Sequence, residues 1–293
     1  MSGPSIEKTQ EASQRSGLSP VAALVRRHDR DRFQTALFAP AAEREALFAL
    51  YAFNFEIARV RESVREPMLG HIRLQWWREA IAAAYAGAPP RRHEVVEPLT
   101  AAIRARGLSR EHFERLIDTR ERDLDDAPPE TLAALEDYAE GSSAQLIRLA
   151  LEALGASTPR TQAAATAIGI AYALAGLIRA MPVHARMGRR MIPDDVAAQA
   201  GLDPEDYARE RATPAMRCAV EAIAGAASRH LDSAREMRAE LPRAALPALL
   251  PARIAAMALT RLKRANFDPF SGGVAGDPLQ SWRLALAALS GRF

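Results

Sequence analysis

The sequence predicts an all-α protein. Alanine, leucine, arginine and glutamate dominate it, and apolar residues recur at three- and four-residue intervals. No stretch shows the apolar and polar alternation of a half-buried strand. Glycine and proline gather between the periodic segments, as in "APP", "DAPPE" and "GAST", and indicate where helices end. With 48% hydrophobic residues in 293, the chain can bury a large core.

The periodic segments give the order of the helices. Helices are predicted over residues 19–28, 30–38, 41–63, 67–86, 94–106, 109–125, 130–154, 158–180, 204–210, 213–240, 243–264 and 278–290. Their connections are short, except for the helix-poor stretch 181–206, and no repeat or polar linker divides them. We therefore expect one helical domain over residues 18–293, after a disordered N-terminus of residues 1–17.

Charge and cysteine content restrict the function. The formal net charge is +3, which weakly indicates phosphates or a membrane surface as partners, and nothing resembles a nucleic-acid-binding motif. Because Cys218 is the only cysteine, an internal disulfide and a cysteine metal cluster are excluded. We expect its thiol to be buried and inert. The first residues resemble neither a signal peptide nor a transit peptide, so a cytoplasmic protein is expected. The apolar segment 163–178 is expected to be a core helix, not a membrane span.

The stretch "ALYAFNFEIARVRESV", residues 49–64, has the period of a helix with Glu56, Arg59 and Glu62 away from its apolar face. It resembles the "LYAFCRxxDDxxD" helix of squalene and phytoene synthases, and Tyr51 lies in the matching part. The three acids of that motif fall on Ala58, Arg59 and Glu62. In the family these acids share one side of a helix and hold Mg²⁺ ions that bridge a diphosphate. Alanine and arginine cannot bind Mg²⁺.

A second stretch, "AYALAGLIRAMPVHARMGRRMIP", resembles the family's "LTNILRDVxxDxxxGRxYLP" motif, and Arg179 matches its arginine. The two aspartates of that motif fall on Ala180 and His184. The resemblance implies two helices that face each other across a central cavity, without their metal-binding acids. Arg59, Arg61 and Arg179 are expected to make the cleft positive, unless Arg59 and Arg61 are solvated helix-surface residues with local partners, such as Glu56 for Arg59.

Four stretches together resemble a branch of this superfamily, the NADH dehydrogenase (ubiquinone) complex I assembly factor 6 branch, which also lacks the paired aspartates. They are residues 52–81, 117–126, 135–155 and 176–196. This resemblance implies an isoprenoid-synthase-like fold and a role in assembling respiratory complex I, with complex I subunits or assembly factors as partners. It is also compatible with a prenyl diphosphate or lipid ligand, no metal cofactor, and peripheral contact with the inner membrane of a bacterium. A eukaryotic source would imply a mitochondrial location.

Two other functions stay open. The chain could be an active prenyltransferase of the squalene/phytoene synthase type, with Glu56, Glu62, Asp118 and Asp123 as displaced Mg²⁺ ligands. It could also be a helical interaction module without a ligand. An open apolar tunnel would favour a ligand site, and a filled centre would favour the module.

Several side chains are candidates for the cleft, although each also has a purely structural interpretation. Of Trp76 and Trp77, only one can face the core, so the other is expected at a cavity rim or partner surface. The candidates for the ligand cleft are Tyr51, Glu56, Arg59, Glu62, Trp76, Asp118, Asp123, Arg179 and His184. No catalytic residue or metal site is predicted, and the six histidines have no metal-ligand spacing. The apolar face formed by Leu279, Trp282, Leu286 and Leu289 is expected to dock on the domain, with a membrane surface as the alternative.

Overall fold

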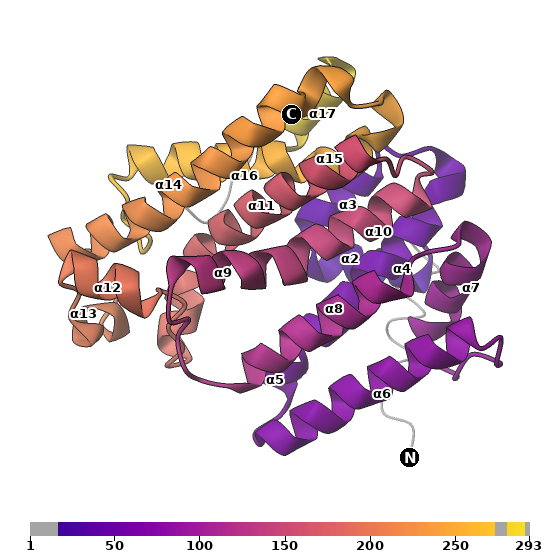
Figure 1. Cartoon of the computed structure of the whole chain (residues 1–293), viewed down its shortest axis with the longest axis horizontal. Helices are drawn as coiled ribbons and strands as arrows, with labels where there is room; N and C mark the ends of the chain where they lie inside the picture. The colour runs from indigo at the N-terminus through magenta and orange to yellow at the C-terminus, as the bar shows by residue number, and fades with distance from the viewer. Residues whose placement is uncertain (1–16, 273–279, 291–293) are drawn as a thin grey trace.

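The computed structural model describes residues 17–272 and 280–290, and every regular element among them is a helix (Figure 1), which confirms the all-α class. The α-helices are α2 (Pro20–His28), α3 (Arg30–Ala36), α4 (Ala41–Ala58), α5 (Val60–Ser63), α6 (Pro67–Tyr85), α7 (Val96–Arg106), α8 (Arg110–Glu121), α9 (Leu132–Ala139), α10 (Gln145–Ala153), α11 (Pro159–Arg186), α12 (Asp194–Ala200), α13 (Pro204–Ala208), α14 (Pro214–Met237), α15 (Leu246–Leu249), α16 (Pro251–Arg264) and α17 (Gln280–Ser290). A π-helical turn, Glu140–Ala144, joins α9 to α10.

Helix α11 is the central element of the bundle (Figure 1). A capping box formed by Thr158 and Thr161 starts this helix. Its first half packs into one hydrophobic cluster with α4, α8 and α10, and its second half packs into another with α12 and α14. The helix is long and apolar enough to cross a bilayer, but 67% of its most apolar window is buried in the bundle. The prediction of a core helix at residues 163–178 is therefore confirmed.

Small residues allow α11 to approach the π-helical turn closely. A Cβ atom added to Gly169 would lie 2.4 Å from the Cα atom of Ala144, so only glycine fits this contact. A Cβ atom on Gly141 would lie 2.1 Å from Oγ1 of Thr119 on α8. The π-helical turn thus lies between α8 and α11, and its neighbouring serines, Ser142 and Ser143, are buried there.

Helix boundaries were wrong where packing outweighs local sequence signals. Helix α11 continues past residue 180 and through Pro182 to Arg186, because burial of Met181 and Ala185 offsets the missing backbone donor. The stretch 181–206 also contains α12, whose buried Val196 and Ala197 pack against α14.

Two predictions of side-chain burial were also wrong. Cys218 is exposed, because the buried face of α14 passes through Met216, Ala219 and Val220 instead. Helix α17 docks through Leu284 and Ala287, and the face that carries Trp282 is exposed. Leu279 and residues 1–16 lie outside the described residues.

Candidate functional site

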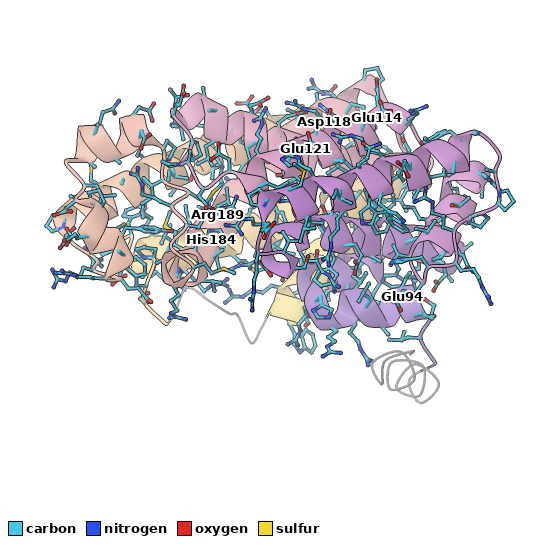
Figure 2. All side chains as sticks on the ribbon, turned by 90° about the horizontal axis from the view of Figure 1, so that it is seen from below. Glu94, Glu114, Asp118, Glu121, His184 and Arg189 are labelled. Carbon is cyan, nitrogen blue, oxygen red and sulfur yellow. The ribbon has the colours of Figure 1, made fainter. Side chains whose placement is uncertain are left out.

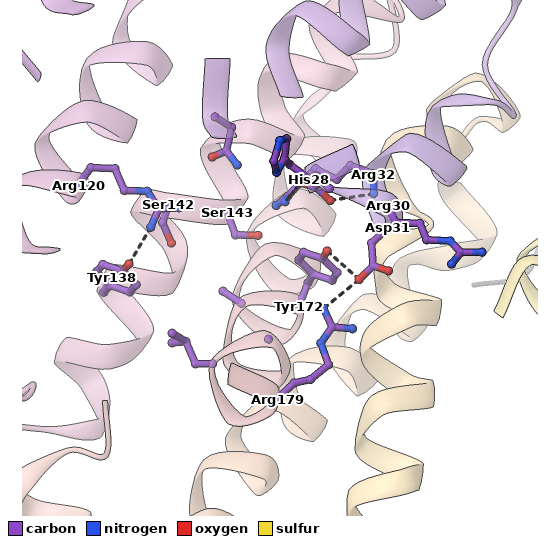
Figure 3. A pocket seen from close by; sticks show the side chains of 15 residues that line it. His28, Arg30, Asp31, Arg32, Arg120, Tyr138, Ser142, Ser143, Tyr172 and Arg179 are labelled. Carbon is purple, nitrogen blue, oxygen red and sulfur yellow. Dashed lines mark hydrogen bonds and ion pairs between the residues drawn. The ribbon is translucent and has the colours of Figure 1, made fainter. Parts of the chain in front are cut away.

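A cavity of about 540 Å³ opens between the α2–α3 junction, α4, the π-helical turn and α11 (Figure 3). The helix that carries the first motif contributes Asn54, and the helix that carries the second contributes Tyr172, Gly176 and Arg179. The two motif-bearing helices therefore border one cavity, as the resemblance implied. Arginines line it in greater number than acids: Arg30, Arg32, Arg120 and Arg179 stand against Asp29 and Asp31. The four positive and two negative charges leave an excess of two positive charges.

Arg32 links the two motif-bearing helices. Its guanidinium carbon lies 6.0 Å from the ring centre of Tyr51 on α4 and 5.0 Å from that of Tyr172 on α11. The side chain of Asp29 caps α3 by accepting a hydrogen bond from the backbone N–H of Arg32 at 3.1 Å. It accepts a second hydrogen bond from Nη1 of Arg32 at 2.7 Å. Burial raises the pKa of Tyr51 to about 12, so this phenol is neutral at pH 7. Tyr51 thus packs beside the cavity and holds Arg32 in place.

Two further arginines are held at the walls of the cavity (Figure 3). Arg179 donates to Asp31 at 2.9 Å, and the hydroxyl group of Tyr172 donates to the same carboxylate oxygen at 3.3 Å. Arg120 donates to the hydroxyl group of Tyr138 at 2.8 Å. These contacts fix both guanidinium groups at the cavity. A group with several negative oxygens could accept from more than one of them.

Three polar atoms at this cavity have no hydrogen-bond partner among the described residues. They are Oδ1 of Asn54, Oγ of Ser143 and Nε of Arg120. Asn54 is 5% exposed and Ser143 is 3% exposed, so neither is a surface side chain. An unpaired buried polar atom costs roughly 1–3 kcal/mol, so a polar ligand that pairs with these atoms would gain binding energy.

A second cavity, of about 340 Å³, lies beside α5 and α6 and is lined by Glu56, Arg59, Val60, Ser63, Arg73, Trp76, Trp77 and His93. Trp77 is buried in the core, and Trp76 packs edge-on against it at the cavity wall, with ring centres 5.1 Å apart. This agrees with the predicted division between the two tryptophans. Glu56 lies 3.5 Å from Arg59, and burial, partly opposed by Arg59, raises the pKa of Glu56.

The predicted basic cleft does not contain all of its arginines. Arg59 lines the second cavity and Arg179 lines the first. Arg61 donates to Asp126 at 2.6 Å, and Glu62 is exposed on α5. The three arginines therefore do not share one cleft. Arg59 and Arg61 follow the end of α4 at Ala58, where Arg59 pairs with Glu56, as the alternative of local partners predicted, and Arg61 pairs with Asp126.

The two aspartates of α8 and the turn after it have different surroundings. Asp118 is exposed on the outer side of α8 beside Glu121 and Glu114 (Figure 2), and it pairs with Arg78 of α6. Asp123 is 3% exposed, and it accepts from Arg189 at 2.6 Å and from Tyr138 at 2.8 Å. Burial alone would raise the pKa of Asp123, but Arg120, Arg189 and these hydrogen bonds outweigh it, so the pKa is lowered.

His184 lies close to Arg189 (Figure 2), and neither side chain lines the cavity between α4 and α11. Its Nδ1 atom is buried and has no hydrogen-bond partner among the described residues. Burial and the charge of Arg189 lower the pKa of His184, so the imidazole is neutral at pH 7. His184 therefore adds no charge beside Arg189.

A family model described as squalene/phytoene synthase matches residues 25–289. The chain belongs to the squalene/phytoene synthase family. It is 34% identical to the mouse protein "NADH dehydrogenase (ubiquinone) complex I, assembly factor 6" over 247 residues. This match covers 84% of this chain and 74% of the relative. The chain is 31% identical over 183 residues to a presqualene diphosphate synthase of Rhodopseudomonas palustris, which covers 60% of this chain and 64% of that enzyme.

Solved structures support the same fold. The squalene synthase HpnC from Alicyclobacillus acidocaldarius superposes with a TM-score of 0.75 at 22% identity, covering 92% of this chain and 98% of that chain. The isoprenoid-synthase-like fold is thereby confirmed.

The acids of this family member do not fit a shared Mg²⁺ site. Among residues 17–272 and 280–290, no group of three or more His, Cys, Asp or Glu side chains could hold a metal ion. The displaced ligands considered from the sequence are separated: Glu56 pairs with Arg59, Asp118 with Arg78, and Asp123 with Arg189, whereas Glu62 is exposed on α5. Beside Glu56, Asp118 and Asp123 an arginine occupies the position that a cation would need.

Three important cavity residues were not predicted: Arg32, Asn54 and Arg120. The stretch "RRHDRDRF", residues 26–33, carried a signal, because such dense alternating charge at a junction between two amphipathic helices is unusual for a plain turn. Asn54 belongs to the stretch 52–81 that carries the resemblance, but its place at the cavity was not predicted, because that place depends on which helices surround α4.

Proposed function

We propose that this chain is a catalytically silent member of the squalene/phytoene synthase family that acts in the assembly of respiratory complex I. The cavity between α4 and α11 would hold the phosphate group of a prenyl or lipid ligand through arginines, without Mg²⁺. The named relatives support the assembly role: the mouse complex I assembly factor 6 matches 84% of the chain, against 60% for the presqualene diphosphate synthase.

The observation that carries the proposal is that both motifs lack metal-binding acids while arginines line the cavity between α4 and α11. Ala58 and Arg59 occupy acid positions of the first motif, and Ala180 and His184 occupy those of the second. Asn54, one turn before Ala58, and Arg179, next to Ala180, line a cavity with an excess of positive charge. Arginine forks bind phosphate oxygens directly, so this arrangement can hold a phosphate group without a bridging metal.

The assembly role is tested by deleting the gene in its source organism. The deletion should lower NADH:ubiquinone oxidoreductase activity and the amount of assembled complex I on a native gel. A plasmid that carries the wild-type gene should restore both. Unchanged complex I in the deletion strain would refute the assembly role.

The proposed absence of catalytic activity is tested by incubating the protein with farnesyl or geranylgeranyl diphosphate and Mg²⁺. We expect no release of diphosphate, whereas the presqualene diphosphate synthase of Rhodopseudomonas palustris, assayed in parallel, is the positive control. That relative is 31% identical, which keeps head-to-head prenyl condensation as the second candidate function. Release of diphosphate by this chain would establish that candidate.

The metal-free site is tested by titrating geranylgeranyl diphosphate, or a phospholipid, in EDTA. Binding should persist in EDTA and weaken at least about tenfold in Arg179→Gln, because a hydrogen bond to a charged group is lost. Arg186→Gln is the matched control on the same helix, because Arg186 is exposed and pairs with Glu210. Binding that requires Mg²⁺ would contradict the arginine mechanism.

The same proposal places the protein beside the membrane that contains complex I. Its partners would be complex I subunits or other assembly factors. In a bacterium this position is the cytoplasmic side of the inner membrane, and in a eukaryote it is inside the mitochondrion.

A further inference from the structure

Helix α17 presents an exposed apolar face. Trp282 is 72% exposed, Leu286 is 61% exposed and Leu289 is 83% exposed. These residues stand at intervals of four and three, so they share one side of the helix. The opposite side, with Leu284 and Ala287, packs on the bundle. The exposed face is therefore presented by a helix that is already docked.

A strongly basic groove adjoins this face. It has a volume of about 620 Å³ and lies between α14, α16 and α17. Six basic residues line it: Arg235, Arg253, Arg261, Lys263, Arg264 and Arg283. Asp232 is the one acid in its described lining, and it accepts from Arg235 at 2.7 Å. Six positive charges against one negative charge leave an excess of five.

The groove and the apolar face meet at Arg283. This residue follows Trp282 directly, and at about 100° per residue it lies between the exposed apolar side and the docked side of α17. Figure 1 shows α14, α16 and α17 together on one side of the molecule, away from α6. Arg283 lines the groove and borders the apolar face, so the two features adjoin along α17 and are treated as one surface.

We propose that this surface binds a membrane that contains anionic phospholipids. The lipid phosphates would lie in the groove, and Trp282, Leu286 and Leu289 would enter the boundary between headgroups and acyl chains. A docked helix with a tryptophan and two leucines outward and basic residues at its flank has the chemistry of an interfacial helix. Nucleic acid would pair with the arginines but would leave the two leucines in water. This site is separate from the cavity between α4 and α11 and does not depend on the ligand bound there.

The proposal is tested by vesicle flotation with the full-length protein. Vesicles of phosphatidylcholine are compared with vesicles that also contain phosphatidylglycerol. The protein should float with the anionic vesicles and not with the neutral ones, and high salt should release it, because salt screens exposed charges. Two variants, Lys263→Glu with Arg264→Glu, and Trp282→Ser with Leu286→Ser and Leu289→Ser, should each lower partitioning at least about tenfold.

Matched controls change the same types of exposed residue elsewhere. Arg65→Glu with Arg92→Glu makes an equal change in charge, and Met68→Ser with Ile72→Ser removes exposed apolar side chains from α6. Both controls should float as the wild type does, and circular dichroism should show that all variants are folded. The proposal is overturned if the wild type binds no anionic vesicles, if it binds neutral vesicles equally, or if the controls lose as much binding as the test variants.

Discussion

Arg189 donates to Oδ1 of Asp123 at 2.6 Å across 66 residues of sequence. This pair joins the turn after α8 to the loop after α11, and Arg189 belongs to the second motif-bearing stretch. Tyr138 also donates to Oδ1, at 2.8 Å, and Arg120 donates to Oδ2 at 3.1 Å. Both carboxylate oxygens thus accept hydrogen bonds from protein donors, and Asp123 has a structural role beside the cavity between α4 and α11.

Removing Asp123 should strongly destabilise the fold. Asp123→Ala leaves Arg120 and Arg189 without their shared buried anion, and breaking a buried ion pair costs roughly 3–5 kcal/mol. Asp118→Ala is the control, because its pair with Arg78 is more than half exposed on the carboxylate side, and such pairs contribute roughly 0–1 kcal/mol. Urea unfolding measures both values. Equal losses in the two variants would contradict the structural role of Asp123.

The contribution of Asp123 should disappear in acid. Its pKa in the folded protein lies below the ordinary value of 3.8, so the folded state favours the ionised form. The stabilisation is complete above the unfolded pKa and is lost as the pH falls through the folded one. The difference in unfolding free energy between wild type and Asp123→Ala should stay constant from pH 7 to about pH 5 and shrink below about pH 4. A difference that grows in acid would be inconsistent with a lowered pKa.

The charge of Glu56 should affect folding stability in the opposite direction to the charge of Asp123. Burial raises the pKa of Glu56, so ionised Glu56 lowers the stability of the folded state at pH 7, and this penalty vanishes as the pH falls through its folded pKa. Glu56→Gln should therefore unfold at a temperature equal to or higher than that of the wild type at pH 7. The difference should close towards pH 4, as differential scanning calorimetry can measure. A clear loss of stability at pH 7 would indicate that the pair with Arg59 outweighs the burial of the charge.

Two glycines of α11 should respond differently to alanine. Gly169→Ala would place a Cβ atom 2.4 Å from backbone Cα of Ala144, so helices must move apart at a cost of roughly 1–3 kcal/mol. Gly176→Ala meets nothing within 4 Å, and alanine in a helix is favoured over glycine by roughly 0.5–1 kcal/mol. Thermal unfolding should therefore separate the two variants in opposite directions. Similar behaviour of both would contradict the close contact at Gly169.

The sequence was sufficient to predict the fold class, the family and the two helices that border the cavity, because apolar periodicity and motif spacing are local properties. Of the three arginines that it grouped, Arg179 lines the cavity, whereas Arg59 lines the second cavity and Arg61 pairs with Asp126. The direction of a side chain after a helix end depends on where the helix stops, and α4 stops at Ala58. Arg32 and Arg120 escaped prediction because their positions depend on contacts between distant helices, such as the rings of Tyr51 and Tyr172.

Gly169 meets the backbone of Ala144 and not a side chain that could rotate away. Helix α11 therefore cannot slide along its axis without a clash, and its register in the bundle is fixed. Ala180 and His184 lie about three and four turns further along the same rigid helix. The contact at Gly169 therefore also sets how far these two motif positions lie from the π-helical turn.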